Sequence, residues 1–217
     1  MRNDAAMILV GQYDSPFVRR VAVTLHHYHM PFSRNALSVF RDVPDMRKIN
    51  PLVRVPALVL ESGETMIDSG AIIDHLDEQA GPARALIPPH GAERRRIHQA
   101  MAVSTGISEK VVATFFERHF HGPKGLSKEL EKRLLGQIKA GLERLEQDCG
   151  SPWFIDSHMT QADITIGCML SHMKLRLPEA FPAGKYPKLH SLSLHCETRD
   201  EFVRSRPSAD ETVPGRS

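Results

Sequence analysis

The feature of this sequence that most restricts its fold is a change in hydrophobic pattern near residue 86. Before this point short apolar runs alternate with helical patterns, and after it only the helical spacing remains. The turn-forming stretch from Gly81-Pro82 to Pro88-Pro89-His90-Gly91 marks a domain boundary at the change. We therefore expect a mixed α/β domain over 6–86, an all-helical domain over 91–205 and a flexible tail over 206–217 with too few apolar residues to order itself.

The first domain is predicted to contain a β-α-β unit followed by a β-β-α unit. Met7–Val10 is an apolar run typical of a buried strand, and Ser15 and Pro16 form a helix start in which serine caps the helix. This helix is expected to end near Tyr28. The other expected elements are a strand over 32–37, a loop or irregular helix over 41–50, a hairpin with strands over 57–60 and 65–67, and a helix from Ser69.

The second half of the chain is predicted to be helical throughout. Apolar residues recur every three or four positions over about 92–116 and 126–145, which predicts two long amphipathic helices. Thr160-Gln161-Ala162-Asp163 has the form of a capping box and begins a further apolar stretch. We expect this last helix to be central and buried.

Composition excludes several classes of function. Lys and Arg total 28 and Asp and Glu total 26, so the formal net charge of +2 gives no reason to expect nucleic acid as a partner. No stretch approaches the roughly 18 apolar residues that cross a bilayer. Cys149, Cys168 and Cys196 form no Cys-x-x-Cys pair, which disfavours a disulfide framework or a zinc site. We expect a cytoplasmic protein with no membrane partner.

The histidines do not predict a metal site either. The chain has 12 of them, and the two clusters are His26-His27-Tyr28-His29 and His119-Phe120-His121. Neither cluster has the helical His-x-x-x-His spacing of a ligand pair. We therefore expect no bound metal.

The most informative motif is Ser15-Pro16-Phe17-Val18, between a predicted strand and a predicted helix. The free N–H groups of a helix start and the positive end of its dipole stabilise an anion, and this suits a thiolate. A dithiol enzyme would have cysteines at positions 15 and 18, but this chain has Ser15 and Val18. The reactive sulfur would then belong to a bound ligand. The alternative is that Ser15 only caps the helix.

Two further motifs suit a peptide-like ligand. A cis bond between Val55 and Pro56 would turn the main chain of Val55 outward, where it could pair with a peptide; the alternative is an ordinary trans turn. At the next helix start, Ser69 suits a carboxylate and Asp68 suits an ammonium group. The alternative for this second motif is a plain capping pair.

Taken in order, these motifs resemble those of the cytosolic glutathione S-transferases, in particular the serine-type branch and bacterial GST-like proteins. The resemblance spans nearly the whole chain and is carried by Ser15-Pro16-Phe17, Asn50-Pro51 to Val55-Pro56-Ala57-Leu58, Ile67-Asp68-Ser69 with Ile72-Ile73, and Thr160-Gln161-Ala162-Asp163. It implies a thioredoxin-like N-terminal domain, an all-helical C-terminal domain and a homodimer. It also implies glutathione as co-substrate, with no further cofactor.

The resemblance assigns roles to individual residues. Ser15 is expected to donate a hydrogen bond to the glutathione sulfur and to lower the pKa of its thiol. The main chain of Val55 is expected to pair with the cysteinyl part, and Asp68 and Ser69 to hold the γ-glutamyl end. The remaining expected glutathione contacts are Phe17, Pro56, Arg41 and Arg54. The two arginines would lie near the glycine carboxylate, although Lys48 is nearby and a plain surface role is the alternative.

The activity implied is attack of the glutathione thiolate on a hydrophobic electrophile, or on a hydroperoxide. The electrophile pocket is expected between the domains, beside Met101, Ser104, Thr105 and Ser108, with Phe17 and Phe40 facing it; ordinary core is the alternative. A protein of this fold that binds a ligand or a protein partner without turnover is a second interpretation. Lyase or thiol-disulfide reductase chemistry through a protein cysteine is disfavoured by Ser15.

Three features complicate these expectations. Leu52-Val53 stands where many family members have glycine, so the loop is expected to follow another path. Asp68 stands where Glu or Gln is more frequent, and its side chain is one methylene shorter. A water-mediated contact with the ammonium group is therefore the alternative to a direct one. Tyr13 lies near Ser15, and tyrosine activates the thiol in other branches, so mutation must decide between them.

Overall fold

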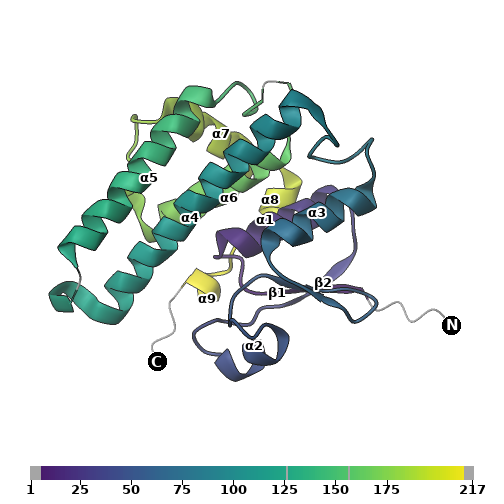
Figure 1. Cartoon of the computed structure of the whole chain (residues 1–217), viewed down its shortest axis with the longest axis horizontal. Helices are drawn as coiled ribbons and strands as arrows, with labels where there is room; N and C mark the ends of the chain where they lie inside the picture. The colour runs from purple at the N-terminus through teal and green to yellow at the C-terminus, as the bar shows by residue number, and fades with distance from the viewer. Residues whose placement is uncertain (1–5, 126, 156, 213–217) are drawn as a thin grey trace. The chain divides into compact units, whose positions relative to one another are not determined.

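The computed structural model describes residues 6–125, 127–155 and 157–212, which form two compact units (Figure 1). The first unit contains the described residues up to Leu86 together with those from Arg199 onward, and the second contains Ile87–Thr198. The expected α/β domain followed by a helical domain is confirmed. No described helix is long and apolar enough to span a membrane.

A four-stranded sheet forms the centre of the first unit. Its strands are β1 (Met7–Val10), β2 (Phe32–Asn35), β3 (Ala57–Val59) and β4 (Thr65–Met66), in the order β2-β1-β3-β4. β1 and β2 are parallel, with Met7 opposite Phe32, and β1 and β3 are antiparallel, with Val10 opposite Ala57. The hairpin of β3 and β4 is antiparallel as well, as expected. Because β1 is central, it ends in the middle of the sheet edge where α1 begins.

Helices cover both faces of this sheet. α1 (Pro16–His27) and α3 (Ser69–Ala80) pack together on one face and α2 (Val43–Ile49) lies on the other (Figure 1). The predicted apolar face of α1 is buried at Val18, Val21, Ala22 and Leu25, whereas Phe17 is only partly buried. α2 occupies the stretch expected as a loop or irregular helix, and it is ordered because Met46 packs into a cluster with Val10 and Ala57.

The second unit consists of helices wherever it is described. They are α4 (Gly91–Gly125), α5 (Lys128–Asp148), α6 (Gln161–Arg176), the 3₁₀ turn η1 (Pro178–Ala180) and α7 (Pro187–Glu197). α6 is buried along nearly its whole length between its neighbours, as the sequence predicted. α4 extends beyond its expected end and is interrupted at Gly122, whose φ of 62° is not helical. The expected start of α5 at Leu126 lies outside the described residues.

The C-terminal segment differs from the expected tail and from the expected helical-domain boundary. Residues 199–212 belong to the first unit and contain α8 (Asp200–Val203) and α9 (Ala209–Thr212). Phe202 is 0% exposed, and the buried guanidinium of Arg19 donates to the carbonyls of Ser205 (3.0 Å) and Phe202 (3.2 Å). Further along the segment, Glu211 accepts from the amides of Tyr13 (2.9 Å) and Ser208 (2.8 Å), so residues expected in the flexible tail are also held by contacts. The rest of the tail, 213–217, lies outside the described residues.

Candidate active site

Ser15 caps α1 at the end of the central strand, where the sequence predicted a reactive site. Its Oγ accepts a long hydrogen bond of 3.4 Å from the Val18 amide, and the residue is half-buried. An accepting hydroxyl oxygen keeps its proton to donate. Pro16 has no N–H and the Val18 amide is bonded to Ser15, so the position combines a half-buried hydroxyl donor with the Phe17 amide at the helix start.

Gly11 brings the Val55 segment against this helix start. Its φ of 127° suits glycine, and a Cβ built there would lie 2.6 Å from Val18 Cγ2 and 2.9 Å from Val55 Cβ. Only a residue without a side chain permits this approach. The sequence prediction assigned Gly11 no role, although a glycine directly after a strand was a signal for it.

The Val55–Pro56 peptide bond is cis, which is the first of the two alternatives that the sequence left open. Val55 is half-buried and Pro56 is buried. The preceding loop is held by Asn50, whose side chain donates to the Arg54 carbonyl (2.8 Å) and accepts from the Leu52 amide (3.0 Å). Val53, where many family members have glycine, has a φ of 50°, a left-handed conformation that is uncommon for a β-branched residue.

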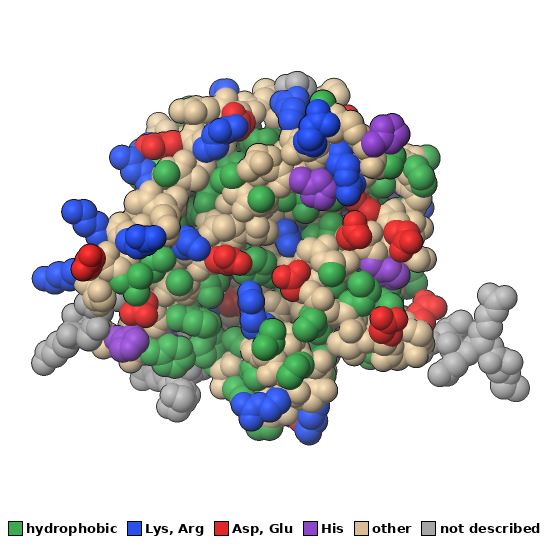
Figure 2. Space-filling view, in the orientation of Figure 1, with side chains coloured by type: hydrophobic (Ala, Val, Ile, Leu, Met, Phe, Trp, Pro, Cys, Tyr) green, Lys and Arg blue, Asp and Glu red, His purple; other side chains and the backbone are tan. Residues whose placement is uncertain are grey.

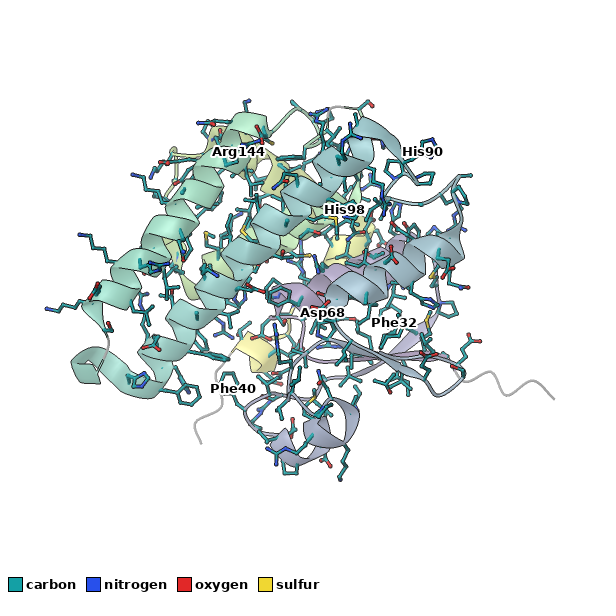
Figure 3. The ribbon with its side chains drawn as sticks, viewed as in Figure 1. Phe32, Phe40, Asp68, His90, His98 and Arg144 are labelled. Atoms are coloured by element: carbon teal, nitrogen blue, oxygen red, sulfur yellow. The ribbon has the colours of Figure 1, made fainter. Side chains whose placement is uncertain are left out.

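Asp68 and Ser69 begin α3 and differ in exposure. Asp68 is exposed (Figure 3), and its Oδ1 accepts from the Gly70 amide at 2.9 Å, so it caps the helix. The peptide bond between Ile67 and Asp68 is cis. Ser69 is 2% exposed, and its Oγ accepts a 2.7 Å hydrogen bond from Nη2 of Arg20 on α1. Asp68 therefore caps the helix through one oxygen, and its expected role toward a ligand stays a prediction.

Arg41 and Arg54, expected near the glycine carboxylate, are both exposed side chains of the loops on either side of α2. Lys48, the alternative cation, forms a 2.7 Å pair with Asp45. The ammonium group of Lys48 is therefore already paired with a carboxylate on its own helix. No described contact links Arg41 or Arg54 to Ser15, so their role stays a prediction.

Tyr13, the alternative candidate for activating the thiol, is buried just after the end of β1. Its amide donates to Glu211 Oε1 on α9 at 2.9 Å, and the guanidinium of Arg34 lies 3.6 Å from the centre of its ring and pairs with Glu211. Burial raises the pKa of Tyr13, against the lowering effect of Arg34 and Arg204. The phenol therefore stays protonated at neutral pH, and the residue is packed against Arg34 and Glu211.

The four expected pocket residues lie on α4 in the second unit. The Ser104 and Ser108 hydroxyls are buried and donate to the carbonyls of Ala100 (2.8 Å) and Ser104 (3.0 Å) of their own helix. Thr105 donates to the Met101 carbonyl in the same way, at 2.9 Å. Phe40, expected near the pocket, is half-buried in the loop before α2 (Figure 3). The hydroxyls of α4 thus serve their helix, and a pocket role for them stays a prediction.

A cavity of about 660 Å³ on the second unit contains none of these four residues. It is lined by α4, α5 and Phe154, with Arg96, Gln99, Val103, Arg144 and Asp148 around it. Arg144 is already paired with Asp148. No motif predicted this cavity, because its lining combines exposed and buried residues of two helices with Phe154.

The cysteines offer no second nucleophile. Cys149, Cys168 and Cys196 are buried thiols outside any disulfide, and all three belong to the second unit. Burial, with help from Glu146 and Asp163, raises the pKa of Cys149 to about 12. No three His, Cys, Asp or Glu residues of the described chain are grouped so as to hold a metal.

Comparison with known proteins agrees with this geometry. Residues 9–84 match the family model of the glutathione S-transferase N-terminal domain and residues 127–192 match that of the C-terminal domain, which together cover more than half of the chain. The chain therefore belongs to the glutathione S-transferase family.

Individual relatives are distant but cover the whole fold. The uncharacterised GST-like protein YibF of Escherichia coli is 27% identical over 93% of this chain and 98% of its own. A glutathione S-transferase of Methylobacterium radiotolerans, solved with glutathione sulfonate, has a TM-score of 0.89 at 27% identity and covers 98% of this chain and 99% of its own. One of Methylobacillus flagellatus, solved with glutathione, has a TM-score of 0.86 at 25% identity, covering 94% and 100%.

Proposed function

We propose that this protein is a serine-type glutathione transferase, in which Ser15 activates the thiol of bound glutathione for attack on a hydrophobic electrophile. The observation that carries the proposal is the Ser15 hydroxyl, half-buried at the start of α1, with its oxygen accepting only a long bond and its proton left to donate. Membership in the glutathione S-transferase family and the glutathione-bound relatives support it.

The chemistry follows from the charge that the site favours. The Ser15 O–H donates to the sulfur, and the amide groups and dipole of α1 add positive potential, so the thiolate form gains stability and the thiol proton leaves to solvent. With an aromatic halide the thiolate then forms a carbon–sulfur bond and the halide departs with its electron pair; with an enone the thiolate adds to carbon and the adduct takes a proton from solvent. With a hydroperoxide the sulfur would break the O–O bond and release the alcohol, and a second glutathione would convert the resulting sulfenic acid to the disulfide and water. Glutathione supplies the only sulfur that this mechanism needs, and no further cofactor enters it.

Glutathione would be held as a short extended peptide along the strand end and α3. The Val55 main chain would pair with the cysteinyl part, beside buried Pro56 and with Phe17 flanking the helix start. Ser69 would receive the γ-glutamyl carboxylate and the second oxygen of Asp68 its ammonium group. Arg41 and Arg54 would attract the glycine carboxylate from their exposed loops. The support is that Gly11 joins the Val55 segment to α1 and Arg20 joins Ser69 to it.

The electrophile would bind near α4, beside Met101 and Thr105. Thr105 is half-buried and Met101 is 9% exposed, whereas Ser104 and Ser108 are enclosed. A thioether such as that of Met101 adapts to differently shaped apolar ligands, which suits a broad substrate class. A hydroperoxide in place of a carbon electrophile would use the same activated sulfur.

We also infer a homodimer, supported by opposite charges on two exposed helix faces. Asp74 and Glu78 on α3 and Arg95 and Arg96 on α4 are all exposed. Figure 2 shows acidic and basic side chains on one face of the molecule. In a symmetric pair the same two faces meet twice, so complementary charges act twice. Light scattering after gel filtration should give twice the 24.3 kDa of one chain, whereas a mass of one chain at micromolar concentration would contradict the inference.

The activity is tested by turnover of a panel of aromatic halides, enones and organic hydroperoxides with glutathione. We expect turnover of at least one class, a fall of roughly a hundredfold in kcat/KM for Ser15→Ala, and little change for Tyr13→Phe. Full activity in Ser15→Ala would remove the mechanism. Tight glutathione binding without turnover of any panel member would favour a binding protein instead.

A further inference from the structure

Arg20 is a buried cation that the proposed mechanism does not use. It lies on α1, five residues after Ser15, and is 5% exposed. Its Nη2 donates to Ser69 Oγ at 2.7 Å, and Ser69 is the residue proposed to receive the γ-glutamyl carboxylate. No sequence motif marks Arg20, which is one of two adjacent arginines on a helix.

The direction of this hydrogen bond constrains the Ser69 proton. A guanidinium group only donates, so Ser69 Oγ must accept from Arg20. A serine hydroxyl has a single proton, and no described residue accepts it from Ser69. A nearly buried hydroxyl that keeps an unused donor beside a helix start is suited to an anionic acceptor from outside the chain.

The surroundings hold the Arg20 guanidinium in place. The ring of Phe17 lies 6.0 Å from its central carbon, and Arg20 as a whole is 5% exposed. A planar guanidinium packed in this way fixes the orientation of its N–H groups. The Ser69 hydroxyl, which accepts from this guanidinium, is therefore restricted in its orientation as well.

We infer that Arg20 is a positioning residue, which turns the Ser69 hydroxyl so that its proton meets the α-carboxylate of the γ-glutamyl group. The inference rests on the proposed function, because it presupposes glutathione in this site. It makes α1 serve both ends of the ligand: Ser15 acts on the sulfur, and Arg20 acts through Ser69 on the carboxylate. Arg20 itself need not touch the ligand.

The test is a double-mutant cycle read by calorimetric binding of glutathione. We expect Arg20→Met and Ser69→Ala each to weaken binding by roughly tenfold. Because both act through one hydroxyl, Arg20→Met should weaken binding no further in the Ser69→Ala background. A glutathione analogue that lacks the glutamyl α-carboxylate should bind the wild-type protein and Arg20→Met equally well.

The neighbouring arginine supplies a matched control. Arg19 is as deeply buried on the same helix but donates to the carbonyls of Phe202 and Ser205, so Arg19→Met should show no coupling to Ser69→Ala. Arg20→Lys keeps the charge with a less directional donor and should bind about threefold more weakly than the wild-type protein. This variant keeps the test valid if Arg20→Met does not fold.

The outcomes separate this inference from the proposed function. If Ser69→Ala weakens glutathione binding but the effect of Arg20→Met simply adds to it, Arg20 is structural and only the inference fails. The inference alone also fails if Arg20→Met weakens binding of the analogue without the carboxylate as much as it weakens binding of glutathione. If Ser69→Ala binds glutathione as tightly as the wild-type protein, the γ-glutamyl subsite fails and the inference fails with it.

Discussion

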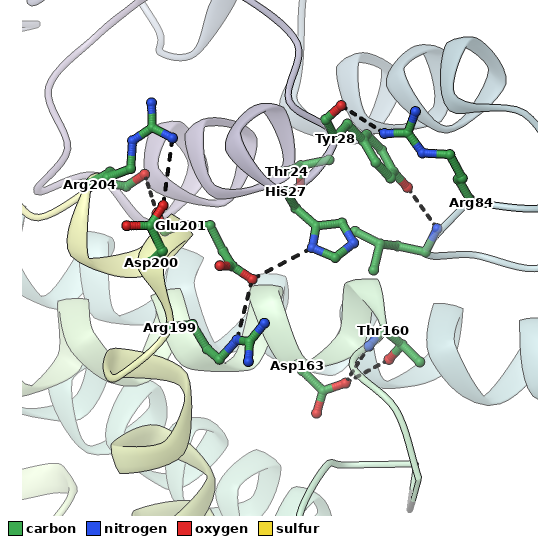
Figure 4. Close-up of polar contacts among 12 residues, drawn as sticks. Thr24, His27, Tyr28, Arg84, Thr160, Asp163, Arg199, Asp200, Glu201 and Arg204 are labelled. Carbon is green, nitrogen blue, oxygen red and sulfur yellow. Dashed lines mark hydrogen bonds and ion pairs between the residues drawn. The ribbon is translucent and has the colours of Figure 1, made fainter.

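The caps of α1 and α6 are both hydroxyl residues, Ser15 and Thr160, and their surroundings give the two hydroxyls opposite uses. At α6 the buried carboxylate of Asp163 accepts from the Thr160 amide (2.8 Å), the Thr160 hydroxyl (2.9 Å) and the Phe154 amide (2.6 Å) (Figure 4). At α1 the Ser15 hydroxyl has one long bond to the Val18 amide. The first helix start is saturated with partners inside the protein, and the second retains bonding capacity for a ligand.

The partners of a helix cap thus indicate whether it serves stability or function. A hydroxyl whose donor and acceptor capacity is used within the protein contributes to folding. One that keeps a donor beside free helix amides can bind a developing anion. The following substitutions test this distinction, and all are read as changes in the free energy of unfolding by urea.

The largest effect is expected for Asp163→Ala. The substitution leaves three buried donors without their acceptor, so we expect a loss of about 4 kcal/mol. Burial raises the pKa of Asp163 even though its donors lower it, which shows how enclosed the group is. Asp148→Ala on the same unit, which breaks only the exposed pair with Arg144, should cost under about 1 kcal/mol. Equal losses for the two variants would contradict the idea of a saturated cap.

Tyr28→Phe tests a saturated hydroxyl in the same unit as Ser15. The Tyr28 hydroxyl donates to Asp77 and accepts from the Leu86 amide at 2.7 Å, beside an Arg84 bond to its carbonyl (Figure 4). Its removal should cost about 2 kcal/mol at pH 7. A loss below about 0.5 kcal/mol would show that this unit tolerates unpaired groups at little cost.

The same residue gives a pH dependence. Burial, with Asp77, raises the pKa of Tyr28, so the folded state keeps a proton that the unfolded chain loses near pH 10. The stability of the wild-type protein should therefore decline as the pH rises above about 10. The decline should be smaller in Tyr28→Phe, and an equal decline would assign it to other groups.

Ser15→Ala should have a small effect on stability. The hydroxyl makes only a long bond in the folded state, so we expect a loss of under about 1 kcal/mol, at the low end for a helix cap. The variant must nevertheless lose most of its activity. A loss as large as that of Asp163→Ala would make Ser15 a structural cap like Thr160.

The smallest effect is expected at His27, whose Nδ1 lies 3.6 Å from Glu201 Oε1 of the C-terminal segment (Figure 4). Burial lowers the pKa of His27, and Glu201 opposes this. Because the folded state binds its proton less readily than the unfolded chain, stability should fall as the pH drops below about 6.5. His27→Gln should make the free energy of unfolding depend slightly less steeply on pH in this range. A steeper dependence in the variant would contradict the assignment of the effect to His27.

The sequence predicted most of the fold because its signals were local. The apolar run of β1, the cap and proline of α1 and the capping box of α6 each lie within a few adjacent residues, and all three were confirmed. The prediction of a flexible tail was wrong for residues 206–212, because Glu211 accepts from the Tyr13 amide and pairs with Arg34, which lie about 180 to 200 positions earlier in the chain. Such pairings have no local signal.

The site was predictable in part for the same reason. Ser15, Val55, Asp68 and Ser69 lie in motifs that can be read along the chain, and the structure places them at helix and strand ends. Arg20 acts through Ser69, which is distant in sequence, so no motif marked it, whereas Gly11 had a local signal in its place directly after a strand but was assigned no role. The predicted roles of Arg41, Arg54 and the α4 residues are contacts with bound ligands, so a structure of the chain alone does not test them.

The thiol pKa of bound glutathione decides whether Ser15 activates the sulfur. It can be followed by the ultraviolet absorbance of the thiolate in the wild-type protein and in Ser15→Ala. If Ser15 donates to the sulfur, the wild-type protein lowers this pKa by about two units relative to free glutathione, and Ser15→Ala loses most of that shift while still binding the peptide. An unchanged pKa in the variant would show that another group activates the sulfur.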